Sequence, residues 1–215
     1  MRRLRRACST ALLAAAAAAC QTLPAAPGGA GPTIKVEEAE SWRGVASPRD
    51  ATALDSLRTR WDHALVSGRA ANLSRYIAAD EELLTPDIRL PRAAPAPGTY
   101  NCRSIRPGRK RWASSPRGFC YVGVVAGQLS LATELRGLRL GGYLWELKGG
   151  ERLVFLGASV PAGAKTASAY GDDPTRDMAG QLERIGDFRY RLVLPDSAPS
   201  PGGIIIVELT AAPQD

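Results

Sequence analysis

The chain has 215 residues, with 28 Lys+Arg against 21 Asp+Glu and a formal net charge of +7 at pH 7. Four of these arginines lie within the first six residues, and no acid lies within residues 1–19. The remainder holds 24 basic and 21 acidic residues, so the charge gives little support to a nucleic-acid partner. With one histidine, His63, the chain cannot complete a typical zinc set.

The N-terminal segment predicts export. After the basic start, Ala11 to Ala19 form an apolar run of nine residues. A membrane-spanning helix needs about 20, so this run fits the hydrophobic region of a secretory signal. Cys20 follows three alanines, which resembles the lipobox of bacterial lipoproteins, where the chain is cut before a cysteine that becomes acylated. We therefore predict a signal peptide over residues 1–19 and lipidation of Cys20.

The residues around Cys20 also predict where the exported protein is located. Residues 20–40 are rich in Pro, Gly and Ala and predict a flexible tether. In similar lipoproteins a residue other than aspartate after the cysteine usually permits transfer to the outer membrane, and Gln21 stands there. We expect a lipid-anchored periplasmic protein at the outer membrane. Ala17 replaces the usual lipobox leucine, so a soluble periplasmic protein with an ordinary cleaved signal, or an uncleaved anchor, stays open.

Two cysteines remain in the predicted exported part, Cys102 and Cys120. An even pair in an oxidising compartment predicts one disulfide. In the chain-entropy model, closing this loop stabilises the fold by about 3 kcal/mol. Their spacing is far from CxxC, which argues against a redox or metal role.

Residues 41–213 are predicted to form a single globular domain that begins with two helices. Ser47 is followed by Pro48 and, three residues after the cap, by Asp50, which is typical of a helix start. Apolar residues at helical spacing continue this helix to about Gly68, and a second helical stretch covers 70–79. Leu83 and Leu84 are expected to pack nearby.

From residue 98 onward the hydrophobic period is two, and glycine-rich turns separate short segments. The expected strands are 98–106, 118–126, 128–134, 139–147, 151–158, 180–185, 187–194 and 203–210. This predicts an α+β, β-dominated fold: a helical pair followed by an antiparallel meander of about eight strands. A small calycin-like barrel is the favoured architecture, with a sandwich as the alternative.

Catalytic groups are not indicated. Adjacent helical positions point about 100° apart, so Asp62 does not orient His63 as in a catalytic triad. Ser159 lacks the second glycine of a GxSxG elbow. The loop with Asp172, Asp173 and Asp177 holds three carboxylates, which suggests either an ordinary turn or a weak ligand or calcium site. We expect no catalytic residue, no resident metal and no cofactor.

Two further groups of residues have a structural and a functional interpretation. A basic run is expected to be a solvated hairpin face, with binding to lipid phosphates as the alternative: Arg103, Arg106, Arg109, Lys110, Arg111 and Arg117. Four aromatic residues are expected in the barrel core or at its rim, with a pocket for a small apolar ligand as the alternative: Trp112, Trp145, Phe155 and Tyr190.

Several stretches of the chain together form a recognisable pattern: Leu57, Trp61–Leu65, Pro97–Arg103, Phe119–Cys120, Leu153–Ala158, Tyr170–Asp173, Gly180, Glu183–Gly186, Arg189–Pro195 and Val207–Leu209. In this order they resemble an exported alphaproteobacterial (sphingomonad-type) family with a domain of unknown function. The resemblance covers about residues 41–213 and implies the same compartment and fold, with no activity to transfer. This chain departs from the family pattern within 121–142, where the family has a more polar strand pair.

These features together predict a non-catalytic envelope module with a binding or structural role. Its expected partners are the membrane, through the lipid anchor, and an envelope protein or a small amphiphile. A protease inhibitor is one form of this prediction, with 107–116 or 197–203 as the exposed segment. The rival hypothesis is an envelope hydrolase that uses the carboxylates around Asp172, Asp173 and Asp177.

Overall fold

The computed structural model describes residues 41–107, 112–196 and 203–212. Every described residue belongs to the second of two units of the chain, the compact unit Glu38–Asp215. The predicted signal peptide, Cys20 and the whole predicted tether lie outside the described residues. No helix among the described residues is long and apolar enough to cross a membrane.

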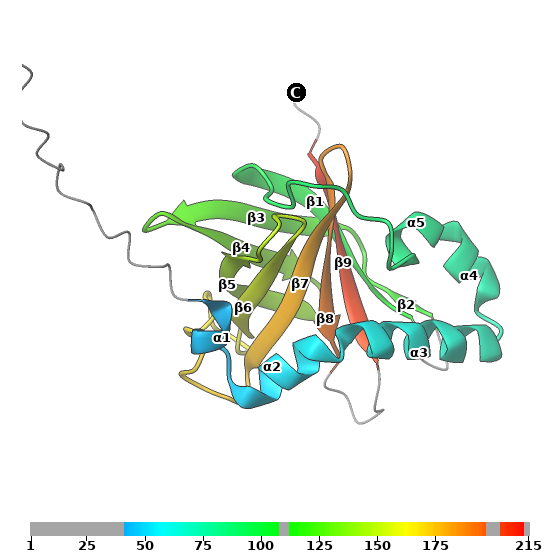
Figure 1. Cartoon of the computed structure of the whole chain (residues 1–215), viewed down its shortest axis with the longest axis horizontal. Coiled ribbons are helices and arrows are strands. Elements are labelled where there is room, and N and C mark those ends of the chain that lie inside the picture. The colour runs from blue at the N-terminus through cyan, green and yellow to red at the C-terminus, as the bar shows by residue number, and fades with distance from the viewer. Residues whose placement is uncertain (1–40, 108–111, 197–202, 213–215) are drawn as a thin grey trace, which may run out of the picture. The chain divides into compact units, whose positions relative to one another are not determined.

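The second unit is built on one antiparallel sheet that closes on itself (Figure 1). The sheet follows the chain order, and β1 also pairs with β9, so eight strands form a closed barrel to which β2 is added beside β1. This confirms the predicted β-dominated meander and its calycin-like barrel. The strands are β1 (Gly98–Arg106), β2 (Ala113–Ser114), β3 (Gly118–Val125), β4 (Gln128–Leu135), β5 (Leu138–Glu146), β6 (Arg152–Ser159), β7 (Asp177–Gly186), β8 (Arg189–Pro195) and β9 (Ile204–Ala211).

Alternate residues of each strand point into the barrel and form its core. Phe155, which is fully buried, and Tyr190 belong to this core, and Tyr190 meets Tyr100 edge to face at 5.9 Å between ring centroids. Gly157 faces the same interior, where a Cβ would lie 2.5 Å from the Phe155 ring. A barrel of about eight strands is just wide enough to be filled by side chains. Phe155 and Tyr190 are therefore packing residues.

Within the described residues, five helices precede the barrel: α1 (Trp42–Val45), α2 (Pro48–Asp55), α3 (Leu57–Ala70), α4 (Ser74–Ala79) and α5 (Glu81–Leu84). The predicted start of α2 is confirmed, because Ser47 Oγ accepts from Asp50 N at 3.2 Å and Pro48 is the first helical residue. The predicted single helix to Gly68 is wrong in one respect, since the helix ends at Asp55 and a new one begins at Leu57. The short helices α1 and α5 were not predicted.

The helices cover one side of the barrel and create a second core. Helix α2 contacts β7, and α3 contacts β8 and β9. Leu57, Trp61 and Leu65 of α3 pack against outward-facing barrel residues such as Val193 and Ile206. Both cores lie within residues 41–212, so this unit folds around its own interior.

Candidate functional site

A row of alternating charges crosses the outer face of the barrel. Register places its members opposite one another on five adjacent strands, from β6 through β9 to β1. The chain brings together positions more than 100 residues apart in this way. The row consists of Arg152, Glu183, Arg191, Glu208 and Arg103.

Arg191 is the most buried member of the row, with no exposed surface. Its Nη2 lies 2.7 Å from Glu183 Oε2, and its guanidinium stacks on the Trp61 ring at 4.6 Å. The same guanidinium donates to backbone carbonyls of the segment after α5, including those of Thr85 at 2.7 Å and Ile88 at 2.8 Å. Burial lowers the pKa of Arg191, against the attraction of Glu183, and the guanidinium remains charged.

Glu208 of β9 binds the arginines at the β1 end of the row. Its carboxylate accepts from Arg103 Nε at 2.6 Å and from Arg189 Nε at 2.8 Å. Burial alone would raise the pKa of Glu208, but the hydrogen bonds and charges of these two arginines outweigh it and lower the pKa. Arg103 also binds the Asp80 carboxylate, so it is not part of a solvated face and that prediction is wrong for this residue.

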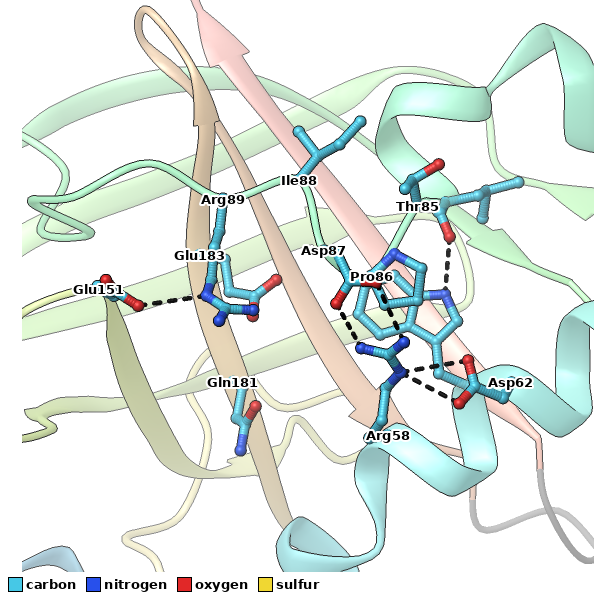
Figure 2. A network of polar contacts seen from close by, with 12 residues as sticks. Arg58, Asp62, Thr85, Pro86, Asp87, Ile88, Arg89, Glu151, Gln181 and Glu183 are labelled. Carbon is cyan, nitrogen blue, oxygen red and sulfur yellow. Dashed lines mark hydrogen bonds and ion pairs between the residues drawn. The ribbon is translucent and has the colours of Figure 1, made fainter.

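Exposed ion pairs continue from the row toward the surface. Figure 2 shows Arg58 of α3 between Asp62 and Asp87, and Arg89 bonded to Glu151. Arg58 is 54% exposed, so these pairs contribute little to stability. The buried charges of the row all have ion-pair or hydrogen-bond partners within the protein, and residues 80–88, which follow α4, cover them. Its evident role is to hold that segment against the barrel.

A groove on another part of the barrel's outer face is open. It has a volume of about 430 Å³ and lies between β4, β5 and the long connection from β6 to β7. Its floor is made of small residues, because Ala132 and Gly141 are direct register partners there. Tyr143, 39% exposed, stands on the floor, and the stretch 165–170 forms the opposite wall.

The polar groups of the groove favour an anion. Lys165 lines it, and no carboxylate partner of Lys165 is present among the described residues. Glu134 also lines it, but both of its oxygens bind Arg139, at 2.9 and 3.3 Å. The Ser168 hydroxyl in the same wall is buried and has no hydrogen-bond partner within the described structure. The groove thus offers one cation, Lys165, and an apolar floor, and the buried Ser168 hydroxyl lies within its wall.

Tyr170 fastens the wall of the groove to the helices. Its hydroxyl donates to Asp50 Oδ2 at 2.7 Å and accepts from Ser47 N at 2.9 Å. Asp50 is buried. The pKa of Tyr170 is raised, mainly because its own hydroxyl is partly withdrawn from water. Ala167 closes the base of the wall, because a Cβ on Gly141 would lie 3.4 Å from the Ala167 Cβ.

The three aspartates proposed as a ligand loop each serve the loop's own backbone. Asp172 accepts from Ala169 N at 3.1 Å, and Asp177 accepts from Gly171 N at 2.9 Å. Asp173 accepts from the Thr175 hydroxyl at 2.6 Å and from Thr175 N at 3.0 Å, and these hydrogen bonds lower the pKa of its carboxyl. No cluster of His, Cys, Asp or Glu suited to a metal ion occurs among the described residues.

The other predicted residues fall in several places. Cys102 and Cys120 form the predicted disulfide between β1 and β3. His63 is exposed on α3, and Ser159 ends β6. Part of each segment proposed for protease inhibition, 108–111 and 197–202, lies outside the described residues.

Sequence reasoning missed both the charge row and the groove. A signal for the first was present: Glu183 and Arg191 lie at equal distances from the turn at Asp187, so a tight hairpin would pair them. The groove had no comparable signal, because its wall is a long connection whose path depends on Tyr170 and Ala167.

Comparisons with known proteins give one finding. No curated protein sequence and no solved structure matches the chain. The model of a domain of unknown function, DUF4893, matches residues 42–208, which is more than half of the chain and spans the helices and nearly all of the barrel. The chain therefore belongs to the DUF4893 family.

Proposed function

We propose that this protein is a non-catalytic binding module of an alphaproteobacterial (sphingomonad-type) envelope, exported and anchored by a lipid on Cys20, most consistently at the outer membrane. Its ligand is a small amphiphile with an anionic head group, bound in the groove between β4, β5 and residues 165–170. The observation that carries the proposal is the groove itself, which combines an apolar floor with Lys165, a cation that has no carboxylate partner among the described residues.

The size and shape of the groove suit such a ligand. A volume of about 430 Å³ lies within the range of small-molecule sites. Ala132 and Gly141 leave room for an acyl chain beside the Tyr143 ring, and Lys165 can meet a carboxylate or phosphate at the mouth. The hollow beside α1 is of similar volume, about 440 Å³, but Glu146, Glu151, Arg152 and Lys148 make its lining highly charged.

The hydrolase hypothesis lacks comparable support. The carboxylates of Asp172, Asp173 and Asp177 accept hydrogen bonds from loop backbone groups, and none of these residues lines the groove. Of the three, Asp177 lines a different hollow of about 210 Å³ between α2 and β7.

Binding of dodecanoate to residues 20–215 with Cys20→Ser tests the groove, measured by titration calorimetry. Lys165→Glu should weaken binding at least tenfold, ~1.4 kcal/mol, because it replaces attraction by repulsion. Ala132→Trp should abolish binding by filling the floor. The matched controls Lys148→Glu, on an exposed hairpin, and Ala78→Trp, on α4, should bind normally. Equal weakening by Lys148→Glu would contradict the proposal.

The anchor requires a separate measurement. The intact mass of protein from membranes should show a chain that begins at Cys20 and carries diacylglyceryl and acyl groups. It should also lack two hydrogens, because Cys102 and Cys120 are oxidised. An unmodified chain cut at another residue would refute lipidation and leave the groove proposal intact.

A further inference from the structure

Exposed apolar side chains gather on one part of the barrel. Among the described residues, five of the eight large hydrophobic side chains that are exposed lie on β3 and β5. Contiguous apolar surface of this kind on a soluble domain usually marks an interaction site. The five are Phe119 at 49%, Tyr121 at 45%, Val124 at 56%, Val125 at 48% and Tyr143 at 39% exposed.

Strand register shows that this surface is continuous. Phe119, Tyr121 and Val125 occupy alternate positions of β3 and so share its outer face. Tyr143 lies on the same face two strands away, because it pairs with Ser130, which in turn pairs with Gly123. The helices contact β7, β8 and β9, on another side of the barrel. In Figure 1 the outer ends of β3 and β4 extend away from α3, α4 and α5.

The same surface carries no charge. Residues 118–133 contain no Asp, Glu, Lys or Arg. Thr99 and Asn101 of β1, the register partners of Tyr121 and Phe119, are also uncharged. Glu134, the register partner of Phe119, is neutralised by Arg139 in an ion pair, and the exposed cations Arg117 and Lys165 lie at the margins of the surface. We call this surface, which consists of Phe119, Tyr121, Val124, Val125 and Tyr143, the β3 face.

We propose that the β3 face rests on the membrane, with the end of the β3–β4 hairpin inserted at the bilayer interface. The hairpin end is apolar and protruding: Val124, Val125, Ala126 and Gly127 are all exposed. Phe119 and Tyr121 follow behind it along β3, where aromatic rings can lie at the level of the lipid head groups. Residues 122–127 at the hairpin end contain no polar side chain, which suits the apolar side of a bilayer interface better than a protein interface with its polar rim.

The length of chain between Cys20 and Ser41 is compatible with contact between the β3 face and the membrane. If Cys20 is the anchor, about 20 residues separate it from Ser41, and a Gly- and Pro-rich segment of that length spans roughly 25 Å. The domain would then stay within reach of the bilayer that holds its lipid. The inference does not require the anchor, however, because the β3 face belongs to the folded unit itself.

Flotation with vesicles of phosphatidylethanolamine and phosphatidylglycerol tests the proposal. The protein is residues 20–215 with Cys20→Ser, so that no lipid contributes. The parent protein should bind the vesicles saturably. The double variant Val124→Asp, Val125→Asp should reduce the fraction of protein that floats with the vesicles at least tenfold. Val66→Asp is the matched control, because Val66 is 62% exposed on α3, and it should float like the parent. Circular dichroism verifies that each variant is folded.

A reporter gives an independent measurement. The fluorescence of a Val125→Trp variant should shift to the blue when vesicles are added, whereas that of Val66→Trp should not. No flotation of the parent, or equal flotation of all variants, would overturn the proposal. So would a dimer in sedimentation equilibrium that the Val124→Asp, Val125→Asp variant abolishes, because the occupant would then be a second copy. The groove variant Lys165→Glu should float normally, which separates this test from that of the groove.

Discussion

Arg191 and Glu183 face each other on β8 and β7, 2.7 Å apart, with 0% and 6% of their side chains exposed. Removing two charges from water is costly, and the pair is tolerable only because both ions are well hydrogen-bonded. Arg191 meets this condition by also donating to carbonyls of α5 and of the segment between α5 and β1. The pair therefore joins the helices to the barrel.

Replacement of Arg191 by Met should destabilise the fold by about 3–5 kcal/mol, because Glu183 would be buried without a partner. Equilibrium unfolding in urea measures this loss. Adding Glu183→Gln should recover part of it, since the stranded charge is removed. Arg58→Met is the control: Arg58 is 54% exposed, and its loss should shift the urea midpoint only slightly. Equal effects of the two single variants would contradict this assignment.

Glu208 should make stability sensitive to acid. Its pKa is lowered in the folded state by Arg103 and Arg189, so it contributes stability above the ordinary pKa of 4.5. This contribution should be lost as the pH falls below that value. Urea midpoints between pH 7 and 3 should therefore drop less steeply for Glu208→Gln than for the parent. The exposed Glu146→Gln should follow the parent, and parallel curves for all three proteins would refute the prediction.

Tyr170→Phe should loosen the wall of the groove. The change removes the hydrogen bonds to Asp50 and Ser47 and should cost about 1–2 kcal/mol, because Asp50 is buried. Limited trypsin digestion should then cut faster after Lys165. Cleavage after Lys148, in the hairpin between β5 and β6, should keep its rate and serves as the internal control. Unchanged cleavage after Lys165 would show that Tyr170 does not hold the wall.

The disulfide should resist reduction in the folded state, because Cys102 and Cys120 are only 2% and 0% exposed. Thiol titration in the presence of a reductant should find both sulfurs protected without urea and reactive with it. The double variant Cys102→Ala, Cys120→Ala should be less stable by about 3 kcal/mol. Rapid reduction of the folded chain would contradict this expectation.

Local patterns predicted most of the barrel. The strands over 98–106 and 118–126 match β1 and β3 to within a residue, because alternating side chains and adjacent glycines define them. The break between α2 and α3 at Ser56 was not visible, since Leu54 and Leu57 keep helical spacing across it. The two-residue strand β2 exists only through its pairing with β1.

The charges were misjudged for a different reason. Glu183, Arg191 and Glu208 occupy outward positions of their strands, and such positions face water in most antiparallel sheets. Here the segment after α4 covers that face, so outward side chains become buried. Pairing between β1 and β9 also joins residues such as Arg103 and Glu208, 105 positions apart. Only the closed barrel reveals that relationship.

The pairing of β1 with β9 also sets the order of assembly. Hairpins from β3 to β8 can form one after another as the chain emerges, because each joins neighbours in sequence. β1 cannot gain its β9 partner until residues 204–211 have been made. A chain shortened before Ile204 would leave the edges of β1 and β8 unpaired, and unpaired edges promote aggregation. The last strand thus determines whether the chain closes its barrel or leaves two strand edges exposed to other chains.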